Sequence, residues 1–393
     1  MQFSQRTNWN TEESELARAH RERVAAGLPV ADLTASNPTR CGFEYDAHLL
    51  AALSDPRALD YDPNPRGLAT ARKAVCAYYG DHGVYVHAGQ VVLTTSTSEA
   101  YSFLFRLLCD PGSEVLTLAP GYPLFDFLAV LDDVKLQTAG FVYDHGWQIE
   151  PEGLRQAITP ATRAIVLVHP NNPTGHFTKT WEAEELAAIC REHDLALIVD
   201  EVFLDFGLGG GAEENAPRSF AEGLDEVNVF VVSGLSKIAG LPQMKSAWIV
   251  ATGAQSDAAL ERLEVIADTF LSMNAPVQWS MPDWLAGRGG IQQQIAARVR
   301  ANLAALDEAL AVLPAVQRLA VEGGWYAVLR IPALGPDEQT VLRLLERGVW
   351  VHPGYFFGME AAGWLVVSLL GREEEFKQGL RVLVEHFGEE SRK

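Results

Sequence analysis

The sequence is poor in cysteine, and its cysteines form no recognisable pattern. There is no Cys-x-x-Cys pair and no histidine at the spacing of a shared metal site; the four cysteines are Cys41, Cys76, Cys109 and Cys190. We therefore expect free thiols in a reducing compartment, with neither a disulfide framework nor a metal site.

Long apolar runs are absent as well. No uninterrupted stretch reaches the roughly 20 residues that a membrane span needs. Residues 1–23 are polar and charged, unlike the apolar core of a signal peptide. We expect a soluble, cytoplasmic protein that makes no contact with a membrane.

Basic residues are scarce relative to acidic ones. The sequence has 31 lysines and arginines against 51 acidic residues, which gives a net charge of -20. Proteins usually meet nucleic acid with a basic face, so this balance argues against a nucleic-acid partner. Hydrophobic residues make up 48% of the 393 positions, which excludes a largely disordered chain and predicts two domains.

Apolar runs alternate with longer amphipathic stretches through the middle of the chain. Residues 180–193, for example, have the pattern of a crossover helix. The runs have the length of buried strands and lie at 91–93, 115–118, 164–168, 195–199, 227–232 and 247–250. This alternation predicts an α/β domain with a largely parallel sheet, in which ligands gather at the carboxyl ends of the strands.

The pattern changes from about residue 291 onward. A long helix-like stretch at 291–313 precedes strand-like runs at 327–331 and 365–369 and a final helix near 373–387. These elements predict a second, smaller unit. The glycine-rich stretch 207–215 predicts a flexible surface loop.

Three polar signals follow the predicted strands in a fixed order. Asn172 lies in an Asn-Asn-Pro-Thr-Gly turn, Asp200 ends a buried apolar run, and Lys237 follows another run among small residues. A lysine can form a Schiff base with the aldehyde of pyridoxal 5′-phosphate (PLP), a carboxylate can pair with its pyridinium nitrogen, and an amide can bind its ring hydroxyl. The ordered trio therefore indicates a PLP enzyme.

With these motifs the chain resembles the class I/II aminotransferases, the fold-type I family of PLP-dependent enzymes. The resemblance runs from the Asn-Pro at 37–38 through the motifs at 61–67, 110–116 and 120–123 and the trio above to those at 323–326 and 351–354. It implies a large domain with a mostly parallel sheet at residues 46–290. It also implies a smaller α+β domain built from residues 1–45 and 291–393.

The resemblance assigns further roles at the cofactor. Lys237 would be the catalytic lysine, Asn172 would bind O3′, and Tyr122 would stack on the ring. Thr97 and Ser98, which follow a strand and open a helix, would bind the phosphate with Lys245, which replaces the family's usual arginine. Tyr61 would reach the phosphate in the neighbouring subunit, which implies a homodimer.

Three positions depart from the family pattern. Phe203 replaces a tyrosine whose phenol would bind O3′, so we expect a raised pKa of the Schiff-base linkage. Ser36 replaces a glycine that is common near the substrate carboxylate. Val366 stands where the family has the arginine that binds the substrate α-carboxylate, a contact worth about 1.5 to 3 kcal/mol.

The loss at position 366 leaves three interpretations. The substrate is an amine or amino alcohol without an α-carboxylate, or the chain no longer turns over amino acids, or another arginine has taken over the contact. The candidates for such a replacement are Arg40, Arg288, Arg330 and Arg372.

The resemblance favours an aminotransferase that moves an amino group from an amino donor to an oxo-acid acceptor. The same cofactor also supports elimination and decarboxylation, so a PLP lyase, such as a C–S lyase, is the alternative. A PLP-binding protein without catalytic activity is a third and weaker interpretation.

Overall fold

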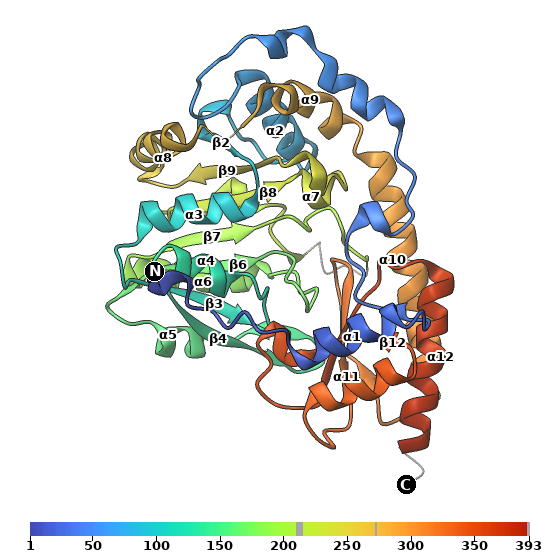
Figure 1. Ribbon diagram of the computed structural model, residues 1–393. Helices are drawn as coiled ribbons and strands as arrows, with labels where there is room; N and C mark the ends of the chain where they lie inside the picture. Colours follow the sequence, from blue (N-terminus) through green and yellow to red (C-terminus); the bar gives the residue numbers. More distant parts are fainter. Residues whose placement is uncertain (210–214, 272, 391–393) are drawn as a thin grey trace.

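The computed structural model describes residues 1–209, 215–271 and 273–390, and its main body is a twisted sheet covered by helices (Figure 1). Residues 210–214 of the glycine-rich stretch lie outside the described residues. The sheet has eight strands in the order β2-β9-β8-β7-β6-β3-β4-β5. Their bounds are β2 Val91–Thr94, β3 Glu114–Ala119, β4 Lys135–Tyr143, β5 Trp147–Ile149, β6 Thr162–Val168, β7 Ala196–Asp200, β8 Val229–Gly234 and β9 Ala247–Thr252.

The centre of this sheet is parallel, as the sequence predicts. Strands β4, β3, β6, β7 and β8 pair in parallel, whereas β9 runs antiparallel to both β8 and β2, and β5 is antiparallel to β4. Every residue of β7, β8 and β9 is buried, which explains why these strands are continuous apolar runs.

Helices cover both faces of the sheet. One face packs on α2 (Ala69–Asp81), α6 (Thr180–His193) and α9 (Ala275–Ala286), and the other packs on α3 (Thr97–Leu108), α4 (Phe125–Leu131) and α8 (Ser256–Phe270). Alternate residues of one strand, such as Leu197 and Ile198 of β7, belong to opposite cores. The short helices α5 (Pro151–Ala157) and α7 (Leu235–Ile238) complete this part. No helix within the described ranges is long and apolar enough to span a bilayer.

A second sheet lies beside the first and has its own core. Its order is β10-β11-β14-β13, with β10 at Gln317–Arg318, β11 at Tyr326–Arg330, β13 at His352–Pro353 and β14 at Trp364–Ser368. The helices packed around it are α1 (Glu15–Ala25), α10 (Gly289–Leu310), α11 (Asp337–Glu346) and α12 (Glu373–Glu390). The helices and strands expected after residue 291 are therefore present.

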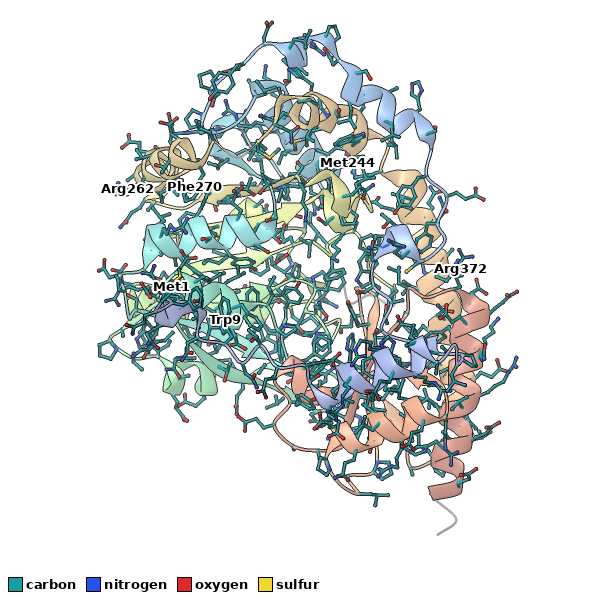
Figure 2. All side chains as sticks on the ribbon, viewed as in Figure 1. Met1, Trp9, Met244, Arg262, Phe270 and Arg372 are labelled. Carbon is teal, nitrogen blue, oxygen red and sulfur yellow. The ribbon has the colours of Figure 1, made fainter. Side chains whose placement is uncertain are left out.

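The N-terminal segment is tied to this second sheet and to the first. Strand β1 (Ala31–Asp32) pairs in parallel with β12 (Val349–Trp350), which places the N-terminal segment beside the C-terminal part of the chain. Further upstream, the ring of Trp9 packs edge-on against Phe127 of α4 at a centroid distance of 5.6 Å; Figure 2 labels Trp9 at that side of the molecule.

Candidate active site

The carboxyl ends of β6, β7 and β8 bring the three sequence signals to one edge of the sheet. Asp200 is the last residue of β7, Lys237 lies in α7 directly after β8, and Asn172 lies in the loop after β6. These strands are parallel neighbours in the sheet. Side chains far apart in the sequence therefore meet where ligands bind in sheets of this kind.

Lys237 is a largely buried amine. Its Nζ lies 5.3 Å from the ring centroid of Trp325 and 5.9 Å from that of Phe203. Within the described part of the chain, Nζ has no hydrogen bond and no ion pair. Burial lowers its pKa, and the negative charge of Asp200 works in the opposite direction. A desolvated amine with a lowered pKa is a better nucleophile toward an aldehyde.

Asp200 is a buried carboxylate that lacks a cation at short range. Its Oδ1 accepts a hydrogen bond from the Val202 amide at 3.0 Å, and its Oδ2 accepts one from the Tyr101 hydroxyl at 3.1 Å. Burial raises its pKa to about 6, although both donors and the charge of Lys237 lower it. A positively charged ring nitrogen would offset the cost of burying this carboxylate.

The turn that carries Asn172 leaves its side-chain amide free. Asn171 closes the turn, because its Oδ1 accepts hydrogen bonds from the amide and the hydroxyl of Thr174 at 3.3 and 2.8 Å. Asn172 is buried, and its Oδ1 has no hydrogen-bond partner among the described residues. A buried amide oxygen without a donor is costly unless a ligand supplies one, and the Nδ2 of the same amide could donate to a cofactor oxygen.

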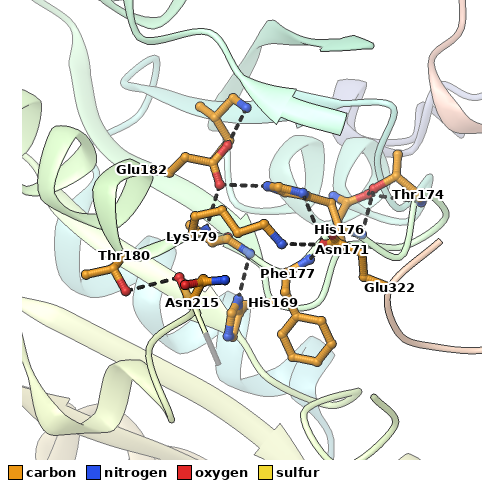
Figure 3. A network of polar contacts seen from close by, with 12 residues as sticks. His169, Asn171, Thr174, His176, Phe177, Lys179, Thr180, Glu182, Asn215 and Glu322 are labelled. Atoms are coloured by element: carbon orange, nitrogen blue, oxygen red, sulfur yellow. Dashed lines mark hydrogen bonds and ion pairs between the residues drawn. The ribbon is translucent and has the colours of Figure 1, made fainter. Parts of the chain in front are cut away.

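A network of buried polar groups holds this turn against the second sheet (Figure 3). Glu322 Oε2 accepts hydrogen bonds from Lys179 Nζ at 2.6 Å and from the Phe177 amide at 2.9 Å. His176 Nε2 lies 2.7 Å from Glu182 Oε2, and its Nδ1 lies 3.6 Å from Glu322 Oε2. The segment that leads into β11 is thereby joined to the loop that carries Asn172.

Thr97 and Ser98 occupy the first turn of α3, where unpaired backbone amides and hydroxyls can converge on an anion. The N-cap residue, Ser96, already accepts a hydrogen bond from the Glu99 amide at 3.1 Å. Lys245 is exposed, has a positive φ of 50°, and makes no ion pair within the described segments. These groups have the donor chemistry that a phosphate requires.

Both tyrosines expected at the cofactor are exposed to solvent, Tyr61 more than Tyr122. Tyr122 is partly exposed, packs edge-on against Phe125 at 5.9 Å and feels the charge of Asp200. The amide of neighbouring Gly121 donates to the Phe357 carbonyl at 2.9 Å and fastens this loop to the second sheet. Tyr61 is 74% exposed, as expected of a residue that has no contact with the site of its own chain.

Val366 is fully buried in β14, where it pairs with Val328 and His352. Two of the four arginines considered as replacements are engaged elsewhere. Arg288 forms an ion pair with Asp81 at 2.7 Å, and the guanidinium of Arg330 stacks on Trp364.

The other two arginines lie on the surface. Arg372 is exposed at the outer edge of the molecule, and Arg40 is exposed as well (Figure 2). Within the described residues, none of the four arginines forms a hydrogen bond or ion pair with Lys237, Asp200 or Asn172.

Sequence reasoning missed one residue of this site, Tyr101, which binds Asp200. The only signal was its position, four residues after Thr97 and therefore on the same face of α3. The lysine, the buried carboxylate and the unpartnered amide together fit PLP, and with the eight-stranded sheet they define a PLP-dependent enzyme of fold type I.

Comparison with known proteins gives the family. The chain belongs to the aminotransferase class I and II family, whose family model matches residues 45–383. It is 28% identical over 368 residues to the glutamate-pyruvate aminotransferase AlaA of Escherichia coli K12, a match that covers 90% of this chain and 89% of that protein. It is also 28% identical over 346 residues to an alanine aminotransferase of Mycobacterium tuberculosis, covering 83% of this chain and 78% of the relative.

Solved structures confirm the fold. The alanine aminotransferase of Pyrococcus furiosus superposes with a TM-score of 0.88 at 24% identity and covers 99% of this chain and 100% of its own. The aspartate aminotransferase of Thermus thermophilus with maleate has a TM-score of 0.84 at 24% identity, with 98% and 99% covered. The protein is a PLP-dependent aminotransferase.

Proposed function

We propose that Lys237 carries the cofactor and that the enzyme moves an amino group from a primary amine donor to an oxo acid. The observation that supports this most directly is the buried Nζ of Lys237, which has a lowered pKa and no hydrogen-bond partner within the described chain. Such an amine is suited to bind an aldehyde reversibly and then to act as a base.

The remaining cofactor contacts follow from the chemistry of each side chain. Asp200 would pair with the ring nitrogen, Asn172 would bind O3′, and Tyr122 would stack on the ring. We assign the phosphate to Thr97, Ser98 and Lys245, together with Tyr61 of the partner subunit in a homodimer. PLP, when bound, supplies an electron sink that weakens the bonds at the donor carbon.

The protein side chains have three tasks in the transfer. Lys237 Nζ would take the proton from the donor carbon and return it to the cofactor carbon on the other side of the transferred nitrogen, and the lowered pKa of this amine suits it to act as that base. Asp200 keeps a proton on the ring nitrogen through its negative charge. Trp325 and Phe203 flank the amine with apolar surface and limit the access of water to it.

The valine at position 366, where the resemblance leads us to expect an arginine, supports a substrate without an α-carboxylate. Val366 and its neighbour Val328 are buried and uncharged, and a carboxylate placed against them would lose its hydration without gaining a cation. The names of two relatives point to alanine and glutamate, which both carry an α-carboxylate, so a donor without one would set this enzyme apart from them. We infer that amines or amino alcohols are the better donors.

We also propose the domain division expected from the sequence. Residues 46–290 contain the large sheet, and residues 1–45 and 291–393 form the smaller domain. The pairing of β1 with β12 supports joining the two outer segments in one unit.

The test is an absorbance spectrum of the PLP-loaded protein, repeated with amines, amino alcohols and α-amino acids. We expect the band of Lys237-bound cofactor to disappear with amines, in step with formation of an oxo product. Lys237→Arg keeps the positive charge but cannot carry the cofactor, so it should show neither the band nor turnover. Conversion by α-amino acids alone would refute the donor class, and release of free ammonia would indicate a lyase instead.

A further inference from the structure

The hydroxyl of Tyr101 contacts the carboxylate that faces the ring nitrogen. It donates to Asp200 Oδ2 at 3.1 Å, and Tyr101 itself is fully buried, with its ring packed edge-on against Phe125 at 4.9 Å. Burial and the nearby charge of Asp200 raise the pKa of this phenol well above its usual value. Tyr101 is therefore neutral at neutral pH and donates its hydrogen bond there.

A buried carboxylate next to a protonated nitrogen has two ways to balance charge. The proton can stay on the nitrogen and leave an ion pair, or it can move to the carboxylate and leave two neutral partners. A poorly solvated site favours the neutral pair, because both charges lose hydration. Hydrogen bonds donated to the carboxylate stabilise its charged form and favour the ion pair.

Asp200 accepts such a bond at each of its oxygens. Val202 donates a backbone amide to Oδ1, which no side-chain substitution can remove, and Tyr101 donates to Oδ2. Tyr101 is thus the one side-chain group, within the described residues, that hydrogen-bonds Asp200. Phe203, whose ring lies 5.9 Å from Lys237 Nζ, has no hydroxyl to offer to O3′.

We propose that Tyr101 is a positioning residue that acts through Asp200 to keep the ring nitrogen of the bound cofactor protonated. This inference rests on the proposed role of Asp200. Because Phe203 contributes no phenol at O3′, Asn172 is the side chain that we assign to that oxygen. Asp200 with Tyr101 would control the charge at the nitrogen. Residue 203 thus lacks a phenol, whereas Tyr101 supplies a phenol that binds Asp200.

The position of Tyr101 in α3 gives this contact a fixed geometry. Thr97 opens the helix at the proposed phosphate site, and Tyr101 follows one turn later on the same face. One rigid helix therefore spans the distance from the phosphate to the carboxylate at the nitrogen. A shift of either anchor would move the other.

The test uses PLP labelled with ¹⁵N in its ring, bound to the full-length protein and observed by NMR. The wild type should show the chemical shift of a protonated ring nitrogen throughout the neutral range. In Tyr101→Phe the signal should move toward that of neutral pyridine, because the lost bond to a charged group alters the proton balance by about tenfold or more. We expect kcat to fall by a similar factor, with KM changed less.

Tyr78→Phe is the matched control. Tyr78 is also fully buried and donates its hydroxyl to a carboxylate, Asp205 Oδ2, at 2.8 Å. The same atom is removed, so loss of folding stability should be comparable while the ring nitrogen stays protonated. An equal shift of the ¹⁵N signal in both variants would overturn the proposal, because it would report a structural effect.

The wild-type spectrum keeps the idea testable if Tyr101→Phe does not fold. A neutral ring nitrogen in the wild type would overturn the proposal directly. Failure of the proposed function looks different: PLP would then not bind Lys237 at all, and neither protein would show the absorbance of the linked cofactor. A linked cofactor whose nitrogen signal is the same in the wild type and in Tyr101→Phe would refute the role of Tyr101 alone.

Discussion

At the scale of single residues, the site is built from polar groups that the fold leaves without partners. Asn172 has a buried oxygen without a hydrogen bond, and Asp200 is a buried carboxylate whose raised pKa reports incomplete charge compensation. Lys237 sits between aromatic rings. Each of these groups costs stability in the absence of a ligand, so PLP binding should stabilise the protein.

Position 203 allows a direct test of how the protein controls the cofactor. Phe203→Tyr would restore a phenol beside Lys237, and its hydroxyl could bind O3′ in its ionised form. We expect the pKa of the PLP–lysine linkage to fall by about 1 to 2 units, since a hydrogen bond to a charged group contributes about 1.5 to 3 kcal/mol. A pH titration of the cofactor absorbance measures this shift.

Phe206→Tyr supplies the control for this substitution. Phe206 is buried and stacks on the same Trp325 ring, at 5.2 Å, but its ring has no contact with the Lys237 amine among those found in the described structure. The titration should be unchanged in that variant. A titration of Phe203→Tyr that matches the wild type would show that residue 203 does not face O3′.

At the scale of elements, the loop of residues 169–182 and the segment around Glu322 form one unit. Burial raises the pKa of the Glu322 carboxyl, but hydrogen bonds from His176, Lys179 and the Phe177 amide outweigh this and lower it to about 2. Because the folded-state pKa lies below the ordinary value of 4.5, the stabilisation is complete above pH 4.5 and is lost as the pH falls toward 2.

Glu322→Gln should therefore destabilise the protein in a pH-dependent way. We expect a loss of about 1 to 3 kcal/mol in the free energy of unfolding near neutral pH, because Lys179 loses its anion and His176 loses the more distant of its two carboxylate partners. The difference from the wild type should shrink as the pH is lowered, and urea denaturation at several pH values measures it. Glu185→Gln, which removes only an exposed pair with Arg155, should cost less than about 1 kcal/mol.

Gly175 is the tightest point of the same unit. It has a positive φ of 71°, and a Cβ there would lie 2.4 Å from Val321 Cγ2 and 2.5 Å from the Gly323 carbonyl oxygen. Gly175→Ala should cost more than about 2 kcal/mol and weaken PLP binding, because it forces the Asn172 loop and the segment before β11 apart. Thermal unfolding and a PLP titration measure the two effects.

Gly27→Ala separates backbone strain from the steric clash. Gly27 has a similar φ of 68°, and a Cβ there would meet no atom within 4 Å. This variant should lose only about 1 kcal/mol, the cost of the left-handed conformation, and bind PLP normally. Equal losses in both variants would mean that the contact at Gly175 does not matter.

Some elements of the fold could be predicted from the sequence and others could not. The helix expected at 180–193 is α6, Thr180–His193, and the continuous apolar runs became β6, β7, β8 and β9. No run pointed to β4, because Lys135–Tyr143 mixes exposed polar and buried residues at an outer part of the sheet. Fully buried strands can be recognised in the sequence as continuous apolar runs. The formation of a half-exposed strand depends instead on the strands that pair with it.

At the scale of the whole molecule, the proposed homodimer makes each site depend on two chains. Tyr61 is exposed, as is Leu59 two residues before it, which fits a residue that acts in a second subunit. Lys237→Ala and Tyr61→Ala should each be impaired alone. When they are mixed under conditions that exchange subunits, half of the dimers are hybrids with one intact site, so about a quarter of all sites should recover.

Activity of the mixture against each variant alone measures this complementation. The control mixture combines Lys237→Ala with Asp200→Ala. Every chain in this mixture keeps Tyr61, but each site lacks either Lys237 or Asp200, so no site is intact. That mixture should not recover. Recovery in neither mixture, from chains shown to exchange, would place Tyr61 outside the neighbouring site.

The sequence by itself determined the enzyme class and the candidate site, because Lys237, Asp200 and Asn172 each lie at or just after the end of an apolar run, in an order that parallel strands bring to one edge. The α/β class follows from the same runs. Only the tertiary structure decided that Tyr101 binds Asp200 across 99 positions, that Glu322 holds the Asn172 loop and that Val366 is enclosed by apolar neighbours. Contacts of this kind arise from packing between distant segments, which no local pattern encodes.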